Sequence, residues 1–370
     1  MTLHIINVEK NVSRLLFHFV LPYLCLHYPQ HEQFIVLLVK CGRKCKIWKA
    51  DLSRAFRQFA VDPHDYVLQC FKWRDDIYVD KRLIFGMRSS PQACQRITNF
   101  VNYILSKENI ISINYIDDFG GVSAASEASS CFSETLNIFK ELGLKVSRDK
   151  CCPPSCIMTF LGKEYNTETI TVRIPEEKMT DIIECVTSFK HKKKCTKRQL
   201  QQLIGKLAFA AECVRSGRLF ISRMSSVLRK YKYNHYRVSL NNEFCKDVMW
   251  WIEFFKTFNG LYYIPEVVWT PPDIIFSNDA SLQGLGGVNF VVHEYFHVDI
   301  PEKFKDLHIG VYEMLAVYIA LKLWQNDLVN KHLRIHCDNQ SVIHIINSGK
   351  GRDGSMLHFA RQISMICTYN

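Results

Sequence analysis

The stretch Asn114–Gly121, NYIDDFGG, places two adjacent carboxylates, Asp117 and Asp118, between an apolar run and a pair of glycines. Asp and Gly are common turn residues, so one interpretation is the tip of a β-hairpin. A second interpretation is a metal site, which requires at least one further carboxylate from elsewhere in the chain. The rest of the sequence therefore decides between the two.

A third carboxylate stands at the end of another short apolar segment. Ile47–Ala50, IWKA, has the composition of a strand and runs directly into Asp51. Ile110–Ile116 also resembles a strand and leads into Asp117 and Asp118. If the two strands are neighbours, three carboxylates meet at one edge of a sheet. Such hard oxygen ligands suit Mg²⁺, which shares its coordination with substrate phosphates. Such a site would carry out phosphoryl transfer on nucleotides, but ordinary surface Asp residues are the alternative, and spacing alone does not favour the site over them.

The composition indicates an intracellular globular protein, cytoplasmic or nuclear, with a basic surplus. The 370 residues include 47 Lys and Arg against 36 Asp and Glu, a net charge of +11 that suits a polyanionic partner. The 15 cysteines follow no regular framework and are expected to be reduced thiols. Two groups of cysteines could be considered as zinc ligands: Cys41 with Cys45, and Cys151 and Cys152 with Cys156. Both lack the ligand spacing of a zinc finger, so buried or unreactive thiols are the preferred interpretation.

No segment is predicted to cross a membrane. Leu15–Leu26, LLFHFVLPYLCL, is too short to span a bilayer. It contains Pro22, and no small-residue cleavage site follows it, so a core helix or a poorly defined leader is expected.

Apolar periodicity and turn residues outline the remaining elements. The expected helices are Leu52–Phe59, Pro91–Leu105, Glu134–Leu142, most of 176–255, and Val311–Trp324. The expected strands are a pair within Val67–Val79, then Phe119–Val122, Met158–Leu161, Ile274–Asn278, Gly287–Val292 and Leu333–Cys337. The segment 34–40 could be a buried helix or a buried strand.

Five segments follow one another in order: KADLSRAFRQ (49–58), LIFGMRSSPQACQ (83–95), YIDDF (115–119), LGLKVSRDK (142–150) and TFLGKEY (159–165). Together they resemble the successive palm motifs of reverse transcriptases. The match looks closest to the DIRS-like class of retroelements, which pair this polymerase with a tyrosine recombinase. A lone YxDD tetrapeptide would be a weak signal, whereas five motifs in register are a strong one. The resemblance covers residues 27–370.

The resemblance implies roles for individual residues. Asp51, Asp117 and Asp118 match the metal-binding triad. Phe56 falls where the family has an aromatic that packs under the incoming sugar and leaves no room for a 2′ hydroxyl, with ordinary core packing as the alternative. The other implied nucleotide contacts are Phe85, Gly86, Tyr115 and Lys150, and Arg88 is a candidate contact to the nucleic-acid backbone. Solvent-facing cations and hairpin packing are the alternatives for these.

A basic stretch lies in the region predicted to be helical. Ser188–Arg198, SFKHKKKCTKR, contains no acidic residue and falls where the family has its thumb and connection. Its cations would follow backbone phosphates without reading sequence: Lys190, Lys192, Lys193, Lys194, Lys197 and Arg198. A solvated helix face or loop is the alternative.

The C-terminal part holds a second set of acids. Asp279 follows the strand IIFSN, Glu313 lies early in the helix VYEMLAVYIALKLW, and Asp338 follows LRIHC. In the last strand, Cys337 is expected on the face opposite Asp338, because side chains alternate. The three segments resemble the first three acidic motifs of a ribonuclease H domain, which implies divalent metal for hydrolysis of the RNA strand of a hybrid. Turn, capping and helix-start roles are the alternatives.

Two departures from the family pattern stand out. The fingers upstream of Asp51 look truncated, and the chain stops before a match to the last ribonuclease H acid, since the loop around Asp353 is not that motif. Four parts are expected: an unassigned leader (1–26), a fingers remnant and palm (27–165), a helical, basic thumb and connection (166–265), and an incomplete ribonuclease H-like domain (266–370).

The expected fold class is an α+β polymerase palm and fingers with a helical thumb, followed by an α/β ribonuclease H-like domain. The implied activity is RNA-directed DNA synthesis with cleavage of hybrid RNA. The implied partners are an RNA template, a DNA primer, the RNA–DNA hybrid and dNTPs. Each site would use two Mg²⁺ ions, with Mn²⁺ as an alternative. A catalytically silent remnant that binds nucleic acid is the second hypothesis.

Overall fold

The structure, a computed structural model, describes residues 28–29, 31–214, 216–233, 235–264, 272–329 and 331–369. The predictions for 1–26 lie outside these residues. The chain divides into two compact units, Met1–Arg173 with Tyr263–Glu266, and Ile174–Tyr262 with Val267–Asn370. The second unit contains both the helical region and the C-terminal strands. The finer four-part division stays a prediction.

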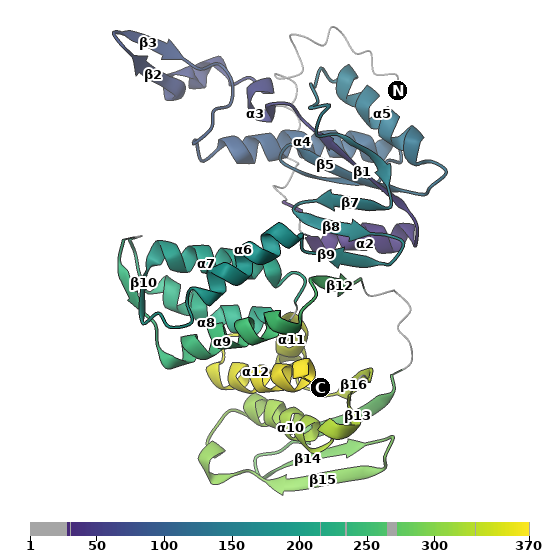
Figure 1. Cartoon of the computed structure of the whole chain (residues 1–370), viewed down its shortest axis with the longest axis vertical. Helices are drawn as coiled ribbons and strands as arrows, with labels where there is room; N and C mark the ends of the chain where they lie inside the picture. The colour runs from purple at the N-terminus through teal and green to yellow at the C-terminus, as the bar shows by residue number, and fades with distance from the viewer. Residues whose placement is uncertain are drawn as a thin grey trace. The chain divides into compact units, whose positions relative to one another are not determined.

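A four-stranded sheet of order β4-β5-β1-β6 forms the centre of the first unit (Figure 1). Its strands are β1 (Lys46–Asp51), β4 (Ser112–Tyr115), β5 (Asp118–Ser123) and β6 (Cys152–Ser155). The helices α4 (Ser90–Lys107) and α5 (Ala128–Glu141) contribute apolar side chains to the same buried core as Trp48 of β1 and Phe119 of β5. Burial of these large apolar side chains stabilises the sheet that carries Asp51 and Asp118.

Gly120 and Gly121 are required by packing within β5. A Cβ added to Gly121 would lie 1.9 Å from Cζ2 of Trp48, which is its partner across the β1–β5 pair. A Cβ added to Gly120 would lie 2.7 Å from Cζ of Phe160. The two glycines after Asp117 and Asp118 therefore let aromatic rings cover the sheet closely.

The rest of the first unit surrounds this sheet. After α3 (Ala55–Gln58) and a 3₁₀ segment (Pro63–Gln69), a hairpin of β2 (Cys70–Trp73) and β3 (Asp76–Val79) has every residue exposed. A second sheet contains β7 (Ile157–Phe160), β8 (Lys163–Asn166) and β9 (Thr171–Arg173) of this unit in the order β9-β8-β7. The strand β12 (Leu261–Tyr263) falls at the division between the two units. The segment 34–40 lies in a helix, α2 (His31–Cys41), whose Phe34 ring lies 4.9 Å from those of Phe160 and Tyr165.

Four helices form the first half of the second unit: α6 (Glu176–Thr187), α7 (Lys197–Ala210), α8 (Gly217–Arg229) and α9 (Asn242–Thr257). The prediction of a helical region is confirmed for these ranges. It is wrong for most of the basic stretch, which forms a turn and then β10 (Lys194–Thr196), paired with β11 (Arg237–Ser239). The side chain of Thr196 accepts from the Gln199 amide and closes a capping box, so α7 begins only at Lys197.

The C-terminal half of the second unit is a sheet of order β15-β14-β13-β16 with helices (Figure 1). Its strands are β13 (Ile274–Ala280), β14 (Gly284–Asn289), β15 (Glu294–Asp299) and β16 (Leu333–His336), and β16 pairs with β13 in parallel. The buried α10 (Ile309–Leu323) packs on β13 and β14, and α11 (Gln340–Ser348) and α12 (Gly354–Tyr369) follow β16. Short 3₁₀ segments occupy Glu302–Phe304 and Gln325–Asp327.

Several element boundaries differ from those predicted. The helix expected at Leu52–Phe59 is confined to Ala55–Gln58, and the strand expected at Gly287–Val292 begins at Gly284 and ends at Asn289. The helix expected from Glu134 begins at Ala128. Among the described residues, none of the helices is long and apolar enough to span a bilayer.

Candidate metal centres

Three carboxylates meet where β1 runs beside the β4–β5 hairpin. The strand register places Asp51 directly opposite Asp118, and Asp117 lies in the two-residue turn before β5. The Leu52 amide donates to the Asp117 carbonyl at 3.0 Å, which fixes that turn against the end of β1. The predicted convergence at one sheet edge is confirmed. The neighbour of β1 is β5, the strand that begins at Asp118, because β4 pairs only with β5.

The electrostatics of this edge favour a cation. Asp51 is 4% exposed, and its Oδ1 accepts no hydrogen bond from the described residues, although Nζ of Lys150 lies 3.6 Å away. Burial raises the pKa of Asp118, against the opposing effect of Lys49, whose Nζ lies 2.9 Å from Asp118 Oδ1, and the Asp51 carboxylate raises it further. Burial, followed by the charge of Asp51, also raises the pKa of Asp117. A buried oxygen without a hydrogen bond, beside two such carboxylates, fits a divalent metal with oxygen ligands.

Gln95 of α4 holds the turn that carries Asp117. Ile116 adopts a left-handed backbone conformation with φ of 54°, which costs a β-branched residue of order 1–3 kcal/mol. Its amide donates to Oε1 of Gln95 at 2.7 Å, and Nε2 of Gln95 donates to the Asn114 carbonyl at 3.1 Å. The sequence offered no signal for this role beyond the position of Gln95 at the end of one motif. We conclude that Gln95 helps to position the carboxylates by holding the Asn114 carbonyl and the Ile116 amide, which directly precede Asp117 in the chain.

Gln95→Ala is expected to lower kcat for nucleotide incorporation by about 10-fold with little change in KM, and to destabilise the first unit by roughly 1–3 kcal/mol, because two buried backbone groups lose their partner. Single-nucleotide incorporation kinetics and urea unfolding would measure both effects. Gln92→Ala, at an exposed position of the same helix, is the matched control. A Gln95→Ala variant with the kcat of the control would contradict the positioning role.

The residues expected to contact a nucleotide are only partly brought together. The Phe56 and Phe85 rings lie 5.0 Å apart, and Phe85 is 74% exposed. Lys150 lies beside the carboxylates, because its Nζ is 3.6 Å from Oδ1 of Asp51. Gly86 has φ of 89°, which favours glycine, and Tyr115 is exposed with its ring 5.8 Å from that of Tyr28. Arg88 is exposed. The roles of all these residues stay predictions.

The second set of acids also converges. Asp279 lies near the end of β13, and Asp338 follows the end of β16. Because β13 and β16 are parallel neighbours, both residues fall at the same edge of the sheet. Glu313, in the second turn of α10, is 3% exposed. Burial raises its pKa to about 7, and the charges of Asp338 and Asp279 act in the same direction. The arrangement is a buried acid facing two carboxylates, which a divalent cation would neutralise.

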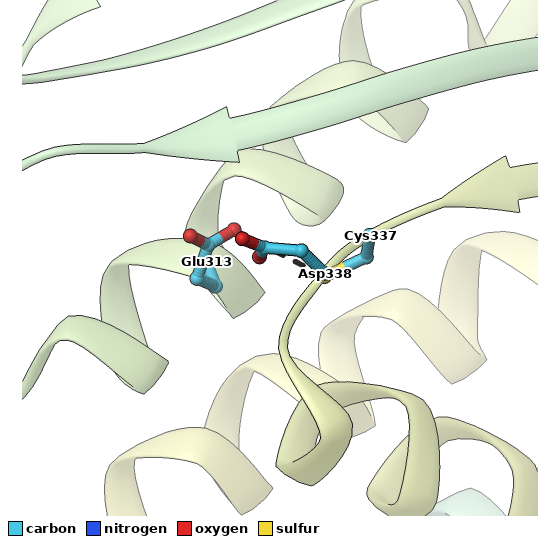
Figure 2. Close-up of side chains that lie close together, drawn as sticks. All are labelled: Glu313, Cys337 and Asp338. Atoms are coloured by element: carbon cyan, nitrogen blue, oxygen red, sulfur yellow. Dashed lines mark hydrogen bonds between the residues drawn. The ribbon is translucent and has the colours of Figure 1, made fainter.

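Cys337 belongs to this second set, which the sequence did not indicate. Its Sγ donates to Oε2 of Glu313 at 3.9 Å. The ligand atoms of Glu313, Cys337 and Asp338 lie within 4.8 Å of one another (Figure 2). The expectation that Cys337 and Asp338 point to opposite faces is wrong, because the ligand atoms of both lie near Glu313. The strand β16 ends at His336, so the alternation of side chains along a strand does not apply to these two residues.

Glu313→Gln is expected to stabilise the metal-free chain in a pH-dependent way. The folded pKa of about 7 lies above the ordinary 4.5, so ionisation destabilises the folded state as pH rises through that interval. The increase in the free energy of unfolding caused by Glu313→Gln should be near zero at pH 4.5 and reach roughly 1–3 kcal/mol at pH 8. Urea unfolding with a chelator would measure it, with Glu302→Gln, an exposed position, as control. A gain that is the same at both pH values would contradict the burial of Glu313 as an acid.

The basic stretch presents some of its cations to solvent and uses others in packing. Lys190, Lys193, Lys194 and Arg198 are exposed. Nζ of Lys192 lies 4.5 Å from the centroid of the Phe189 ring, and Nζ of Lys197 donates to the Lys232 carbonyl at 2.9 Å. Arg237 lies opposite Thr196 in the β10–β11 pair and adds a cation that is far away in the sequence.

Comparisons with known proteins indicate a family for the first part of the chain. Residues 3–165 match the family described as reverse transcriptase (RNA-dependent DNA polymerase). The chain is 23% identical over 363 residues to the enzymatic polyprotein of carnation etched ring virus, covering 91% of this chain and 50% of the polyprotein. It is also 27% identical over 135 residues to the uncharacterized protein K02A2.6 of Caenorhabditis elegans, covering 36% of this chain and 10% of that protein.

Solved structures of the foamy viral protease-reverse transcriptase share the fold. The complex with RNA/DNA hybrid has a TM-score of 0.50 at 15% identity, covering 92% of this chain and 45% of the viral chain. The dRH form with double-stranded DNA has a TM-score of 0.52 at 16% identity, covering 93% and 58%. The chain thus spans about half the length of the viral proteins it resembles.

Proposed function

We propose that this chain, in which residues 3–165 match the reverse transcriptase family, is the RNA-directed DNA polymerase of a retroelement. The observation that carries the proposal is the meeting of Asp51, Asp117 and Asp118 at the β1–β5 edge. Two Mg²⁺ ions held by these acids, or Mn²⁺ in their place, would activate the primer 3′ hydroxyl and stabilise the leaving pyrophosphate. As part of this proposal, the amino-acid sequences of the five motifs support assignment to the DIRS-like class.

The residues around the triad have complementary roles in this proposal. Lys150, 3.6 Å from Asp51, supplies positive charge where a triphosphate would lie. Phe56 borders the sugar of a dNTP and excludes a 2′ hydroxyl, and Phe85, whose ring lies 5.0 Å from that of Phe56, lies against the nucleotide and template. Gly86 permits close backbone approach, and Tyr115 borders the primer end.

The RNA template, DNA primer and their hybrid are the proposed macromolecular partners, with Arg88 and the exposed cations of the basic stretch as phosphate contacts. The foamy viral structures are complexes with RNA/DNA hybrid and with double-stranded DNA, which supports this choice. Such contacts read no sequence and weaken with salt. We also propose an intracellular location, because the cysteines of the sequence follow no regular disulfide framework.

The double variant Lys193→Ala/Lys194→Ala is expected to weaken hybrid binding at low salt and to reduce the dependence of log K on log salt by about 0.9 for each phosphate that is no longer neutralised. Titration of labelled hybrid at several salt concentrations would measure the slope. Lys303→Ala/Lys305→Ala, at exposed positions of a 3₁₀ segment and its C-cap, is the control of equal charge. An unchanged slope in the first double variant would exclude these lysines from the phosphate contacts.

We further propose that Asp279, Glu313 and Asp338 belong to an α/β ribonuclease H-like domain, residues 266–370, that hydrolyses the RNA strand of a hybrid. The proposal is supported by the buried Glu313 between two carboxylates at the edge of the β13–β16 pair. Divalent metal bound there would supply the attacking hydroxide and stabilise the leaving oxygen.

A catalytically silent nucleic-acid-binding remnant is the second candidate, favoured by one observation. Nζ of Lys49 lies 2.9 Å from Asp118 Oδ1, so an ammonium group already neutralises one of the three acids. A metal would have to displace or share this contact.

Primer extension by the purified chain separates the two candidates. A labelled DNA primer on an RNA template, with dNTPs and Mg²⁺, should be extended by the polymerase, and ribonucleotides should be used poorly. Salt-sensitive hybrid binding without extension, by a folded chain, would instead establish the silent remnant.

A further inference from the structure

The side chains of Glu313, Cys337 and Asp338 come together from two different elements. Glu313 projects from α10, and Cys337 and Asp338 lie in the segment between β16 and α11. Figure 2 shows the carboxyl groups of Glu313 and Asp338 facing each other with the side chain of Cys337 beside them. Their ligand atoms, one sulfur and two oxygens, all lie within 4.8 Å of one another.

The donor set differs in kind from that of the β1–β5 edge. There the donors are carboxylate oxygens, which suit a hard cation such as Mg²⁺. Here a thiol lies 3.9 Å from Oε2 of a glutamate that is 3% exposed. Thiolate sulfur is a soft ligand that selects Zn²⁺ over Mg²⁺, and mixed sulfur and carboxylate sites suit Zn²⁺ in tetrahedral geometry.

The spacing is compatible with one ion. Zinc bonds are about 2.3 Å to sulfur and about 2.0–2.2 Å to oxygen, so tetrahedral ligand atoms lie roughly 3–4 Å apart. The observed limit of 4.8 Å, with 3.9 Å between Cys337 Sγ and Glu313 Oε2, needs only small side-chain rotations to reach that range. Asp338 is exposed, which gives an ion access from solvent and leaves a position for water.

We propose that Glu313, Cys337 and Asp338 form a site for a thiophilic divalent cation, Zn²⁺ in particular, completed by solvent. On binding, the thiol releases its proton to solvent and a sulfur–metal bond forms, with no change in oxidation state. The site uses two of the three acids proposed for the nuclease, so Zn²⁺ and Mg²⁺ compete for them. The inference rests on the donor geometry and holds whether or not the chain cleaves RNA.

Cobalt serves as a spectroscopic probe for this site. Titration of Co²⁺ into the metal-free full chain should produce thiolate-to-cobalt charge-transfer absorption that saturates with the ion. Cys337→Ser should remove the Cys337-dependent part of the band and weaken Co²⁺ binding by at least about 10-fold, since removal of a direct ligand costs no less than removal of a supporting hydrogen bond. Cys245→Ser, at a half-buried cysteine of α9, should keep the band.

Alkylation provides a second readout that needs neither absorption nor turnover. Zn²⁺ should slow labelling of Cys337 by iodoacetamide, followed by peptide mass spectrometry, whereas Mg²⁺ at equal concentration should not. Glu313→Gln should weaken that protection while its fold, checked by circular dichroism, is retained. Equal cobalt bands in wild type and Cys337→Ser, or labelling of Cys337 that Zn²⁺ leaves unchanged, would overturn the proposal. Neither assay contains nucleic acid, so failure of the nuclease proposal would be a separate result.

Discussion

Asp118→Asn is expected to slow single-nucleotide incorporation by about 10³-fold or more, because metal-ion catalysis contributes several kcal/mol of transition-state stabilisation. Asp118 lies opposite Asp51 in the strand register, and burial raises its pKa even beside Lys49. Asn keeps the shape of the side chain but removes the charge that binds a cation. The fold should survive, since the variant also removes a buried like charge next to Asp51.

The measurement is a single-turnover incorporation of one dNTP on an RNA template, with hybrid affinity determined in parallel. Asp75→Asn, at an exposed position in the β2–β3 turn, removes the same charge away from the triad and should leave the rate unchanged. Equal loss of activity in both variants would point to a general charge effect. Full activity of Asp118→Asn would exclude Asp118 from the catalytic metal site.

Gly121→Ala is expected to have the largest effect on stability in the first unit. The added Cβ would lie 1.9 Å from Cζ2 and 2.0 Å from Cε2 of Trp48, a fully buried side chain. Overpacking of a core typically costs 1–3 kcal/mol and occasionally more, so we expect about 3 kcal/mol or above. The variant should also lose activity, because Trp48 and Gly121 pair in the same two strands that carry Asp51 and Asp118.

A double variant tests the cause of that destabilisation. Trp48→Phe shortens the ring that the new methyl group of Gly121→Ala would strike, so Trp48→Phe/Gly121→Ala should be more stable than the sum of the two single effects predicts. Gly205→Ala, at an open helical position of α7, has no such neighbour and should be neutral or slightly stabilising. Urea unfolding would report each variant. Additive effects in the double variant would show that the clash with Trp48 is not the source of the destabilisation.

The sequence predicted those features of the first centre that depend on local pattern. The strand before Asp51, the helix α4 and the hairpin that carries Asp117 and Asp118 were expected from composition and turn residues, and the structure has them. The convergence of the acids was conditional on strand pairing. The partner of β1 was not the strand first considered, because pairing is a tertiary choice that β4 and β5 satisfy by folding back on each other.

Contacts between residues far apart in the chain could not be predicted from the local sequence pattern. The glycine pair was considered both as a turn signal and as part of the expected strand Phe119–Val122, but the sequence did not indicate that the two glycines allow Trp48 and Phe160 to pack closely. The basic stretch resembled a helix face, but Lys194 pairs with Ser239 across a sheet, which no local propensity encodes.

The second centre illustrates the limits of periodicity. The alternation rule separated Cys337 from Asp338, but it applies only while the backbone remains a strand, and β16 ends at His336. The role of Gln95 was missed for a similar reason. A side chain that donates to one backbone group and accepts from another two residues later in a distant segment has no sequence signature.

Joint binding of divalent metal by Asp51, Asp117 and Asp118 is the premise of the polymerase proposal, and iron-directed cleavage tests it most directly. Fe²⁺ bound in place of Mg²⁺, with ascorbate and peroxide, generates hydroxyl radicals that cut the backbone next to the ion. We expect cuts beside Asp51 and beside Asp117–Asp118 in the wild-type chain, suppressed by excess Mg²⁺ and absent in Asp118→Asn. A folded wild-type chain that is not cut at either place, or cuts that persist unchanged in Asp118→Asn, would contradict the shared metal site.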